Sequence, residues 1–241
     1  MRRIRYGHLM PQNQSKSRRR RGVLITFEGI EGSGKSTQCA RLAKFLRECG
    51  YRVIETREPG GTPIAERIRS LLLDLPATRA GLSLTTEPLT PECEAALVLA
   101  ARSQHVAQVI EPALREGAVV LCDRFSDSTL AYQGYARGLD VQSLRRMNRF
   151  AARGLSPELT LLFDLPVAIG LARRRQQGAR QNRLDRETQR FHERVRQGFL
   201  DLYTRHPRRI RLLDARADPD SVTEKVAVMV NDFLATHPLR H

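Results

Sequence analysis

The sequence predicts a three-layer α/β fold, in which a five-stranded parallel sheet carries helices on both faces. Short apolar segments alternate with longer amphipathic ones along the chain, and strands that alternate with helices pair in parallel through right-handed crossovers. The 241 residues, 41% of them hydrophobic, are enough for one sizeable core and too few for two full domains. We therefore expect a single domain over residues 22–241.

Five segments have the short, apolar and branched composition of buried strands. The first, VLITFE, is broken by Gly29. Because ligands of parallel α/β sheets bind at the carboxyl ends of the strands, a functional site is expected in the loops that follow these segments. The strands are predicted at residues 23–28, 51–56, 118–122, 159–164 and 210–214.

Between these strands, apolar residues recur with the spacing of a helix. Leu42 and Leu46 lie on one face of the first helix, which ends at Gly50, and Gly117 stops the longest one. Helices are predicted at residues 36–49, 63–73, 92–116 and 221–235, with a loop at 76–91 and further helical stretches between the later strands.

The net charge of +15 is concentrated in two segments. Residues 1–21 hold eight Lys and Arg and no acidic residue, about half of that surplus, and their polar composition predicts a disordered basic arm. Residues 173–196 hold nine arginines and three acidic residues. The rest of the chain is nearly neutral, which argues against a basic stripe that follows a nucleic-acid backbone.

Cysteine usage and hydropathy predict a cytoplasmic protein. The four cysteines show neither the paired spacing of a disulfide framework nor histidine partners for zinc. No apolar run approaches the roughly 18 residues of a membrane span. No apolar stretch follows the basic N-terminus, as a signal peptide would require.

A phosphate-binding loop follows the first strand. Gly29 to Ser36 has the Gly-x4-Gly-Lys-Ser pattern between a strand and a helix, where backbone N–H groups and a helix N-terminus converge on phosphate oxygens. Lys35 is expected to reach the β- and γ-phosphates of ATP, and the Ser36 hydroxyl to bind Mg²⁺. The predicted ATP-binding residues are Gly29, Ile30, Glu31, Gly32, Ser33, Gly34, Lys35, Ser36 and Thr37.

Two residues at the end of the third strand extend this site. Asp123 is expected to hold Mg²⁺ directly or through water, and Arg124 to bind an anionic substrate with its planar guanidinium. A GTPase would also carry Asp-x-x-Gly, which the sequence lacks. The segment from Asn182 to Asp185 only superficially resembles the GTPase motif Asn-Lys-x-Asp, because it has no lysine and follows no strand.

Two strand-end segments resemble the signatures of the thymidylate kinases, which are nucleoside monophosphate kinases of the P-loop NTPase type. One runs from Asp123 to Gln133, and the other is Arg-Glu-Pro-Gly-Gly-Thr at 57–62. The resemblance covers the chain from about residue 23 to the C-terminus and leaves out the basic arm. It implies transfer of the ATP γ-phosphoryl group to dTMP with Mg²⁺ as cofactor. It also implies a homodimer, for which the long helix is a candidate interface.

The resemblance also implies the residues of the acceptor site. Arg124 would hold the acceptor phosphate, Arg102 would read the thymine edge, and Glu31 would position the sugar. The other positions that it implies are Thr129 and Gln133 near the base, Tyr132 against the sugar 2′ position, and a cis bond between Glu58 and Pro59 in the pocket wall.

One position departs from the family pattern. Val98 stands four residues before Arg102, where relatives commonly place a phenylalanine that stacks on thymine. Either a neighbouring aromatic side chain takes over the stacking, or the base is held mainly at its edges.

An arginine-rich lid is predicted at about residues 173–187. Its middle, 176–186, has glycine and polar residues but no apolar face, which predicts a mobile segment between two helices. The resemblance implies that this lid closes over ATP, and Gly32 is typical of relatives that use lid arginines in catalysis. Arg180 and Arg183 are the first candidates for that role, and Arg175 follows.

The residues leave three candidate functions open. The first is ATP-dependent phosphorylation of dTMP to dTDP, which needs no general base because the acceptor phosphate, with a second pKa of about 6, is mostly dianionic at neutral pH. The second is the same reaction on another nucleoside monophosphate. The third is a P-loop ATPase that nucleic acid stimulates.

Overall fold

The computed structural model describes residues 22–73, 88–176 and 182–237. The predicted basic arm at 1–21, most of the predicted loop at 76–91, and residues 177–181 of the predicted lid, with Arg180, lie outside these ranges.

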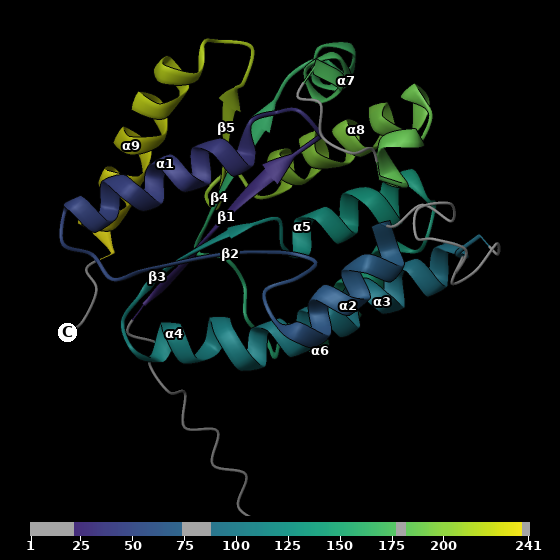
Figure 1. Ribbon diagram of the computed structural model, residues 1–241, viewed down its shortest axis with the longest axis horizontal. Coiled ribbons are helices and arrows are strands. Elements are labelled where there is room, and N and C mark those ends of the chain that lie inside the picture. Colours follow the sequence, from purple (N-terminus) through teal and green to yellow (C-terminus); the bar gives the residue numbers. More distant parts are fainter. Residues whose placement is uncertain (1–21, 74–87, 177–181, 238–241) are drawn as a thin grey trace, which may run out of the picture.

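Five parallel strands form one sheet in the order β2-β3-β1-β4-β5, as the predicted α/β fold requires (Figure 1). The last two strands have the predicted bounds, and the first three each end one residue later than predicted. Because β1 lies between β3 and β4, the loops after β1 and β3 are neighbours at the carboxyl edge. The strands are β1 (Val23–Gly29), β2 (Val53–Arg57), β3 (Val119–Asp123), β4 (Leu159–Asp164) and β5 (Ile210–Asp214).

Helices cover both faces of the sheet, so the predicted three layers are present (Figure 1). In this view α1 and α9 lie together on one side of the strands, and α4 and α6 lie on the other. The helices are α1 (Lys35–Glu48), α2 (Pro63–Leu73), α3 (Pro91–His105), α4 (Glu111–Arg115), α5 (Ser126–Thr129), α6 (Val141–Ala151), α7 (Val167–Gln176), α8 (Gln189–Arg205) and α9 (Pro219–Thr236). Within the described ranges, none has the length and apolar composition needed to cross a membrane.

The central strand β1 is buried on both faces, and its side chains alternate between two hydrophobic clusters. Ile25 and Phe27 pack in the cluster that includes side chains of α1 and α9. Leu24 packs in a second cluster with Ile110 and Leu114, which lie at the end of the long helical stretch. This two-sided burial fixes the position of the loop that begins at Gly29.

The predicted long helix at 92–116 is helical but not uniform. A π-helical turn, η1 (Val106–Ile110), separates α3 from α4. Pro112 follows directly, and its ring nitrogen donates no hydrogen bond to the preceding turn, a common cause of such irregularities. A second π-helical segment, η2 (Leu130–Ala136), continues α5 and carries Tyr132 and Gln133. π-helical turns often occur at functional sites.

Candidate active site

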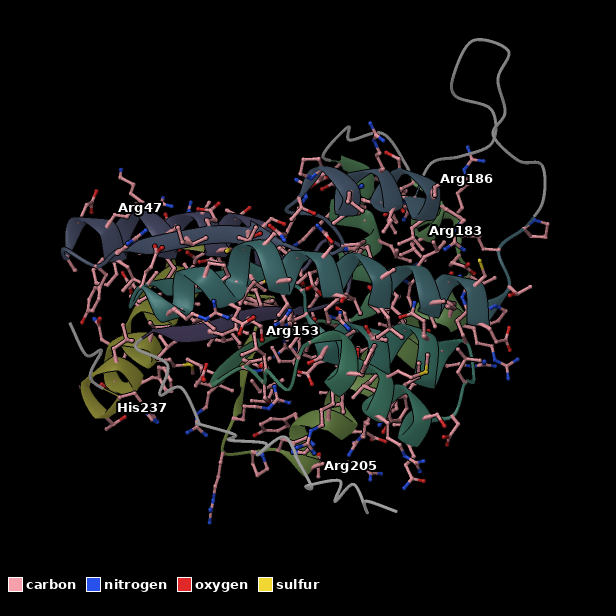
Figure 2. The ribbon with its side chains drawn as sticks, turned by 90° about the horizontal axis from the view of Figure 1, so that it is seen from below. Arg47, Arg153, Arg183, Arg186, Arg205 and His237 are labelled. Atoms are coloured by element: carbon pink, nitrogen blue, oxygen red, sulfur yellow. The ribbon has the colours of Figure 1, made fainter. Side chains whose placement is uncertain are left out.

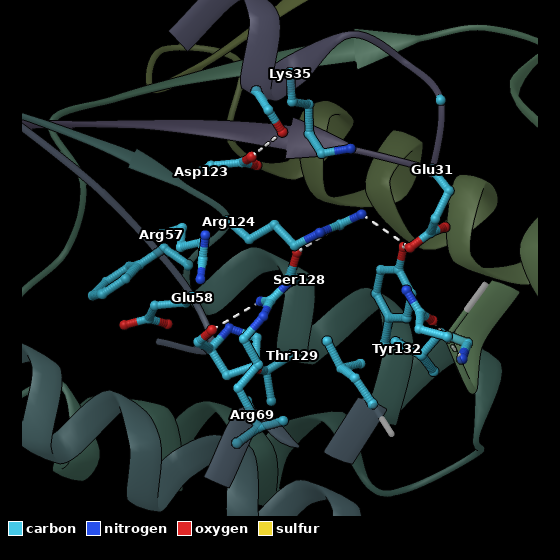
Figure 3. Close-up of a pocket in the computed structure, with 18 of the residues that line it drawn as sticks. Glu31, Lys35, Arg57, Glu58, Arg69, Asp123, Arg124, Ser128, Thr129 and Tyr132 are labelled. Atoms are coloured by element: carbon cyan, nitrogen blue, oxygen red, sulfur yellow. Dashed lines mark hydrogen bonds and ion pairs between the residues drawn. The ribbon is translucent and has the colours of Figure 1, made fainter. Parts of the chain in front are cut away.

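The carboxyl ends of β1, β2 and β3 surround a cavity of about 350 Å³ (Figure 3). Strand β3 pairs with both neighbours, which brings the three loops together. Gly29, Ile30 and Ser33 do not line this cavity, and neither does Arg183. The predicted site residues that line it are Glu31, Gly32, Gly34, Lys35, Ser36, Thr37, Glu58, Pro59, Arg102, Asp123, Arg124, Thr129, Tyr132 and Gln133.

The phosphate loop packs tightly against α7 at Gly32. The backbone of Gly32 is left-handed, with φ at 70°. A Cβ atom added there would lie 2.0 Å from the carbonyl oxygen of Gly170, a distance at which the backbone itself must shift. Gly32 is therefore required for both its conformation and its close contact.

We expect Gly32→Ala to raise the KM for ATP at least about tenfold and to lower the free energy of unfolding by about 1–3 kcal/mol, because the phosphate loop must move away from α7. Steady-state kinetics and chemical denaturation measure the two effects. Gly50→Ala is the matched control: Gly50 also has a left-handed backbone, with φ at 86°, but nothing lies within 4 Å of an added Cβ. If both variants lose ATP affinity alike, the contact with Gly170 is not what Gly32 provides.

Lys35 points along the phosphate loop and is bound by neutral oxygens of the loop itself (Figure 3). Its Nζ donates to the Ile30 carbonyl at 2.7 Å and to the Ser33 hydroxyl at 3.1 Å. Burial and, second, the charge of Arg124 lower the pKa of Lys35 to about 8. An incoming phosphate would add negative charge beside this buried ammonium and favour its charged form.

Ser36 and Asp123 meet across the ends of α1 and β3. The Ser36 hydroxyl donates to Asp123 Oδ2 at 2.5 Å. Among the residues that the structure describes, the other carboxylate oxygen, Oδ1, is buried without a hydrogen-bond partner. Hydroxyl and carboxylate oxygens are the ligands that Mg²⁺ prefers, so this pair fits the predicted metal.

Arg124 follows Asp123 at the end of β3, next to β1, and its side chain reaches the phosphate loop (Figure 3). Its guanidinium donates to the Gly29 carbonyl at 3.0 Å and to Glu31 Oε1 at 3.0 Å, and it lies over the Tyr132 ring at 5.1 Å. The Tyr132 hydroxyl donates to the same Glu31 oxygen at 2.6 Å. Burial opposes ionisation of Glu31, but the charge of the Arg124 guanidinium holds its pKa well below the usual range.

One part of the cavity wall is built around Arg102, which is only 1% exposed. It donates to Glu58 Oε2 at 2.7 Å and to the Thr129 hydroxyl at 2.9 Å. The Glu58-Pro59 peptide bond is cis, as the family resemblance implied. His105, also fully buried, lies 3.1 Å from Glu58 Oε1, so this carboxylate holds two basic side chains.

Two aromatic side chains line the same cavity as Val98. Both Val98 and Phe125 line the cavity. Phe125 is fully buried, and the Arg102 guanidinium lies 5.1 Å from its ring centroid. Tyr132 is the other aromatic side chain among the described residues of the lining. The structure therefore offers aromatic neighbours as well as edge-directed groups, and both predicted ways of holding a base stay open.

The described lid residues place their arginines differently from the prediction. The segment 176–186 was predicted to be mobile. Its last three residues form a 3₁₀ turn, η3 (Leu184–Arg186). Arg183 donates to the Leu72 carbonyl at 2.8 Å and to Glu94, away from the cavity. Figure 2 shows Arg183 beside Arg186 at the end of the molecule opposite His237. Arg174, which the sequence did not single out, lines the cavity and is paired with Asp185 at 3.0 Å.

Sequence reasoning missed two further basic side chains in the cavity wall, Arg57 and Arg69. Arg69 donates to the Pro59 carbonyl at 2.9 Å, and burial and the charge of Arg57 lower its pKa. A bound anion would relieve this repulsion. A weak signal was present, because Arg69 stands four residues after the fully buried Ala65, on the inward face of α2.

A buried histidine beside the phosphate loop was missed as well. His192, on the first turn of α8, has Nδ1 3.4 Å from Glu31 Oε2. The contact lacks hydrogen-bond geometry, and neither ring nitrogen has a partner among the described residues. No signal in the sequence indicated this proximity, because α8 reaches the loop only through tertiary packing.

The comparisons with known proteins agree with this geometry. Residues 27–226 match the family described as thymidylate kinase. The chain belongs to the thymidylate kinase family. A thymidylate kinase of Geobacter sulfurreducens is 51% identical, with 87% of this chain and 97% of that protein covered. One of Thermomicrobium roseum is also 51% identical, over 87% of this chain and 95% of the relative.

A solved structure shows the same fold. The crystal structure of a thymidylate kinase from Ehrlichia chaffeensis superposes with a TM-score of 0.68 at 32% identity, and covers 87% of this chain and 98% of its own. Membership of the family accounts for a phosphate loop that faces a second, arginine-lined binding wall across one cavity. It makes this chain a phosphotransferase.

Proposed function

We propose that this chain transfers the γ-phosphoryl group of ATP to dTMP, giving ADP and dTDP. The observation that carries the proposal is the cavity that Lys35 and Arg124 both line, from the segments that follow the neighbouring strands β1 and β3. One wall has the pattern that binds the triphosphate of ATP. The other has arginines suited to a phosphate monoester, and family membership identifies that acceptor as thymidylate.

The chain's own residues would perform the transfer by positioning and by neutralising charge, which is most of what phosphoryl transfer asks of a protein. Lys35 would contact the β- and γ-phosphates, and the Arg124 guanidinium would bind the acceptor phosphate. Arg102 and Thr129 would contact the base, and Glu31 the sugar. No general base is needed, because the attacking phosphate oxygen is already deprotonated.

Ser36 and Asp123 are the residues proposed to hold Mg²⁺. A magnesium ion bound there supplies positive charge beside the β- and γ-phosphates. The pairing of the two side chains, with one Asp123 oxygen buried and without a hydrogen-bond partner among the described residues, supports this assignment.

The acceptor assay tests the proposed function. The full chain is incubated with ATP, Mg²⁺ and one nucleoside monophosphate at a time, and the diphosphate formed is measured. We expect dTMP to be phosphorylated fastest. Faster phosphorylation of AMP, CMP or UMP would contradict the proposal. Hydrolysis of ATP that DNA or RNA stimulates, without transfer to any monophosphate, would replace it with an ATPase.

Arginines of the lid are proposed to stabilise the transferred group. Arg180→Ala and Arg183→Ala should lower kcat more than they raise the KM for dTMP, because charge in the transition state is lost rather than acceptor binding. Arg183 would first have to leave Glu94, to which it is bound in this structure. Arg174→Ala is a useful comparison, since Arg174 lines the cavity. An unchanged kcat in both Arg180→Ala and Arg183→Ala would contradict the lid assignment.

The basic arm is proposed to take no part in catalysis. A chain that begins at residue 22 should keep kcat and both KM values within about twofold of the full chain, since it keeps β1 and every described residue that lines the cavity. Circular dichroism shows whether the shortened chain folds. A large loss of activity in a folded, shortened chain would place the arm in the site.

The homodimer and the cytoplasmic location stay predictions. Apolar side chains exposed on α2 and α6 support a second copy as partner, and Phe150, at 87% exposure, is the most exposed of them. Analytical ultracentrifugation of the full chain and of Phe150→Ser tests the dimer. A monomeric wild-type chain would contradict it.

A further inference from the structure

Glu28, the residue before Gly29 in β1, is a carboxylate with no exposed surface directly behind the site. Its Oε1 accepts the backbone N–H of Phe125 at 2.8 Å and that of Ser128 at 3.3 Å. Its Oε2 accepts the Ser128 hydroxyl at 2.6 Å. A single side chain of the central strand therefore holds the turn that follows Arg124.

The same contacts reach the guanidinium of Arg124. The Ser128 oxygen that donates its proton to Glu28 accepts an N–H of Arg124 at 3.2 Å. The backbone of Arg124 is left-handed, with φ at 70°, which side chains other than glycine rarely adopt without support. Glu28 accepts the amides of Phe125, which precedes α5, and of Ser128, which lies within it. It therefore supports both the backbone and the side chain of Arg124.

We propose that Glu28 is a positioning residue, whose carboxylate acts through the Ser128 hydroxyl and the amides of Phe125 and Ser128 to orient Arg124 toward the acceptor phosphate. The inference rests on the proposed function, which assigns Arg124 to that phosphate. Glu28 does not line the cavity and so does not bind substrate directly.

The chemistry requires an acceptor at both oxygens of residue 28. Three donors point at this side chain, and only a carboxylate accepts from all of them. Glutamine has the same shape but would present an N–H to the Ser128 hydroxyl. That hydroxyl would then lose the acceptor for its own proton, and its contact with Arg124 would weaken.

Keeping this carboxylate buried is costly. Burial and, second, the negative charge of Asp127 raise the pKa of Glu28 to about 7. Asp127 is itself paired in a two-pronged contact with Arg209, at 2.7 and 2.9 Å. The titratable and charged groups that face Glu28 are Asp127, Arg124, Lys35, Arg209 and the thiol of Cys122.

Glu28→Gln in the full chain tests the proposal. At pH 8 we expect kcat/KM for dTMP to fall about 10- to 100-fold, the size of a lost hydrogen bond to a charged group, with the KM for ATP within about twofold of wild type. The wild-type to variant ratio of kcat/KM should shrink as the pH falls from 8 to 6, since protonation removes the Glu28 charge from the wild type only. Titration of the substrates affects both proteins equally and cancels in the ratio.

Thermal denaturation separates positioning from a merely structural role. The folded pKa of Glu28 lies above its ordinary value of 4.5, so folding disfavours the ionised form. Ionisation of Glu28 therefore lowers the stability of the wild type as the pH rises from 4.5 to 7, and Glu28→Gln lacks this contribution. We expect the Tm of the variant to be equal to or above that of the wild type at pH 8. A structural role would instead give a lower Tm together with the lower activity.

Two further variants complete the test. Glu158→Gln is the matched control, because Glu158 also accepts a backbone N–H of β1, that of Leu24 at 2.8 Å, but at the opposite end of the strand. It should keep wild-type kinetics with dTMP. Ser128→Ala removes the bridging hydroxyl and should lower kcat/KM for dTMP about five- to tenfold. The double variant Glu28→Gln/Ser128→Ala should lose less than the product of the two single losses.

Each result has a defined consequence. A wild-type chain that does not phosphorylate dTMP overturns both the proposed function and this inference. If the wild type is active, two results overturn the positioning role alone. One is a kcat/KM for dTMP in Glu28→Gln within twofold of wild type at pH 8. The other is an equal loss of kcat/KM for ATP and for dTMP. If Glu28→Gln does not fold, Ser128→Ala decides: unchanged dTMP kinetics in that variant overturns the inference.

Discussion

Lys35→Ala should lower kcat about a hundred- to a thousandfold, while the protein remains folded. The substitution removes positive charge from the place where charge moves during phosphoryl transfer, and such preorganised groups contribute most to catalysis. Within the described ranges, the Lys35 ammonium donates its hydrogen bonds to Ile30 and Ser33 of its own loop, so these bonds do not join distant parts of the core. Steady-state formation of dTDP and far-ultraviolet circular dichroism are the measurements.

Lys44→Ala is the matched control for this variant. It removes a lysine from the same helix, but the Lys44 side chain is 80% exposed and its ion pair with Glu48 spans 3.9 Å. Such surface pairs contribute about 0–1 kcal/mol to stability, so activity and Tm should stay close to wild type. If Lys35→Ala retained most of its activity, the proposed role of the phosphate loop in catalysis would be contradicted.

The phosphate loop and the strand ends were predictable because their signals are local. The spacing of Gly29, Gly34 and Lys35 determines a loop conformation within eight residues. Asp123 and Arg124 follow an apolar strand, and parallel strands end at one edge of a sheet. The approach of Arg124 to Glu31 then follows from the pairing of β1 with β3.

The rest of the site depends on contacts that no local pattern encodes. Arg69 enters the wall only because α2 packs beside the loop that carries Pro59. Arg183 was predicted from the charge of its segment and from the family resemblance, and its partner Glu94 lies 89 positions earlier, on α3. Glu28 was taken as the end of a strand, and its role depends on a turn almost 100 residues away. The π-helical turn before Pro112 is different, since the proline was visible in the sequence.

Arg124→Lys should lower kcat/KM for dTMP about a hundred- to a thousandfold, although the charge is kept. The guanidinium already donates to Gly29, Glu31 and Ser128 and still lines the cavity. A planar fork makes these contacts and binds a phosphate in two places, whereas an ammonium acts as a single point charge. A lysine therefore cannot bind the phosphate and also keep the contacts with Gly29, Glu31 and Ser128. This loss lowers both the affinity for dTMP and the rate of transfer.

The left-handed backbone at Arg124 does not complicate the interpretation of this substitution. Arg124 and Arg153 are the non-glycine residues with left-handed backbones within the described ranges, with φ at 70° and 53°. Neither residue gains or loses backbone strain when arginine becomes lysine, so Arg153→Lys controls for the change itself. The Arg153 side chain, labelled in Figure 2, is half-exposed and forms an ion pair with Glu111. Kinetics with dTMP varied at saturating ATP should separate the two variants. Less than a threefold change in Arg124→Lys would mean that Arg124 contributes charge alone, and that the geometry of its contacts with Glu31 and Ser128 does not matter for the acceptor.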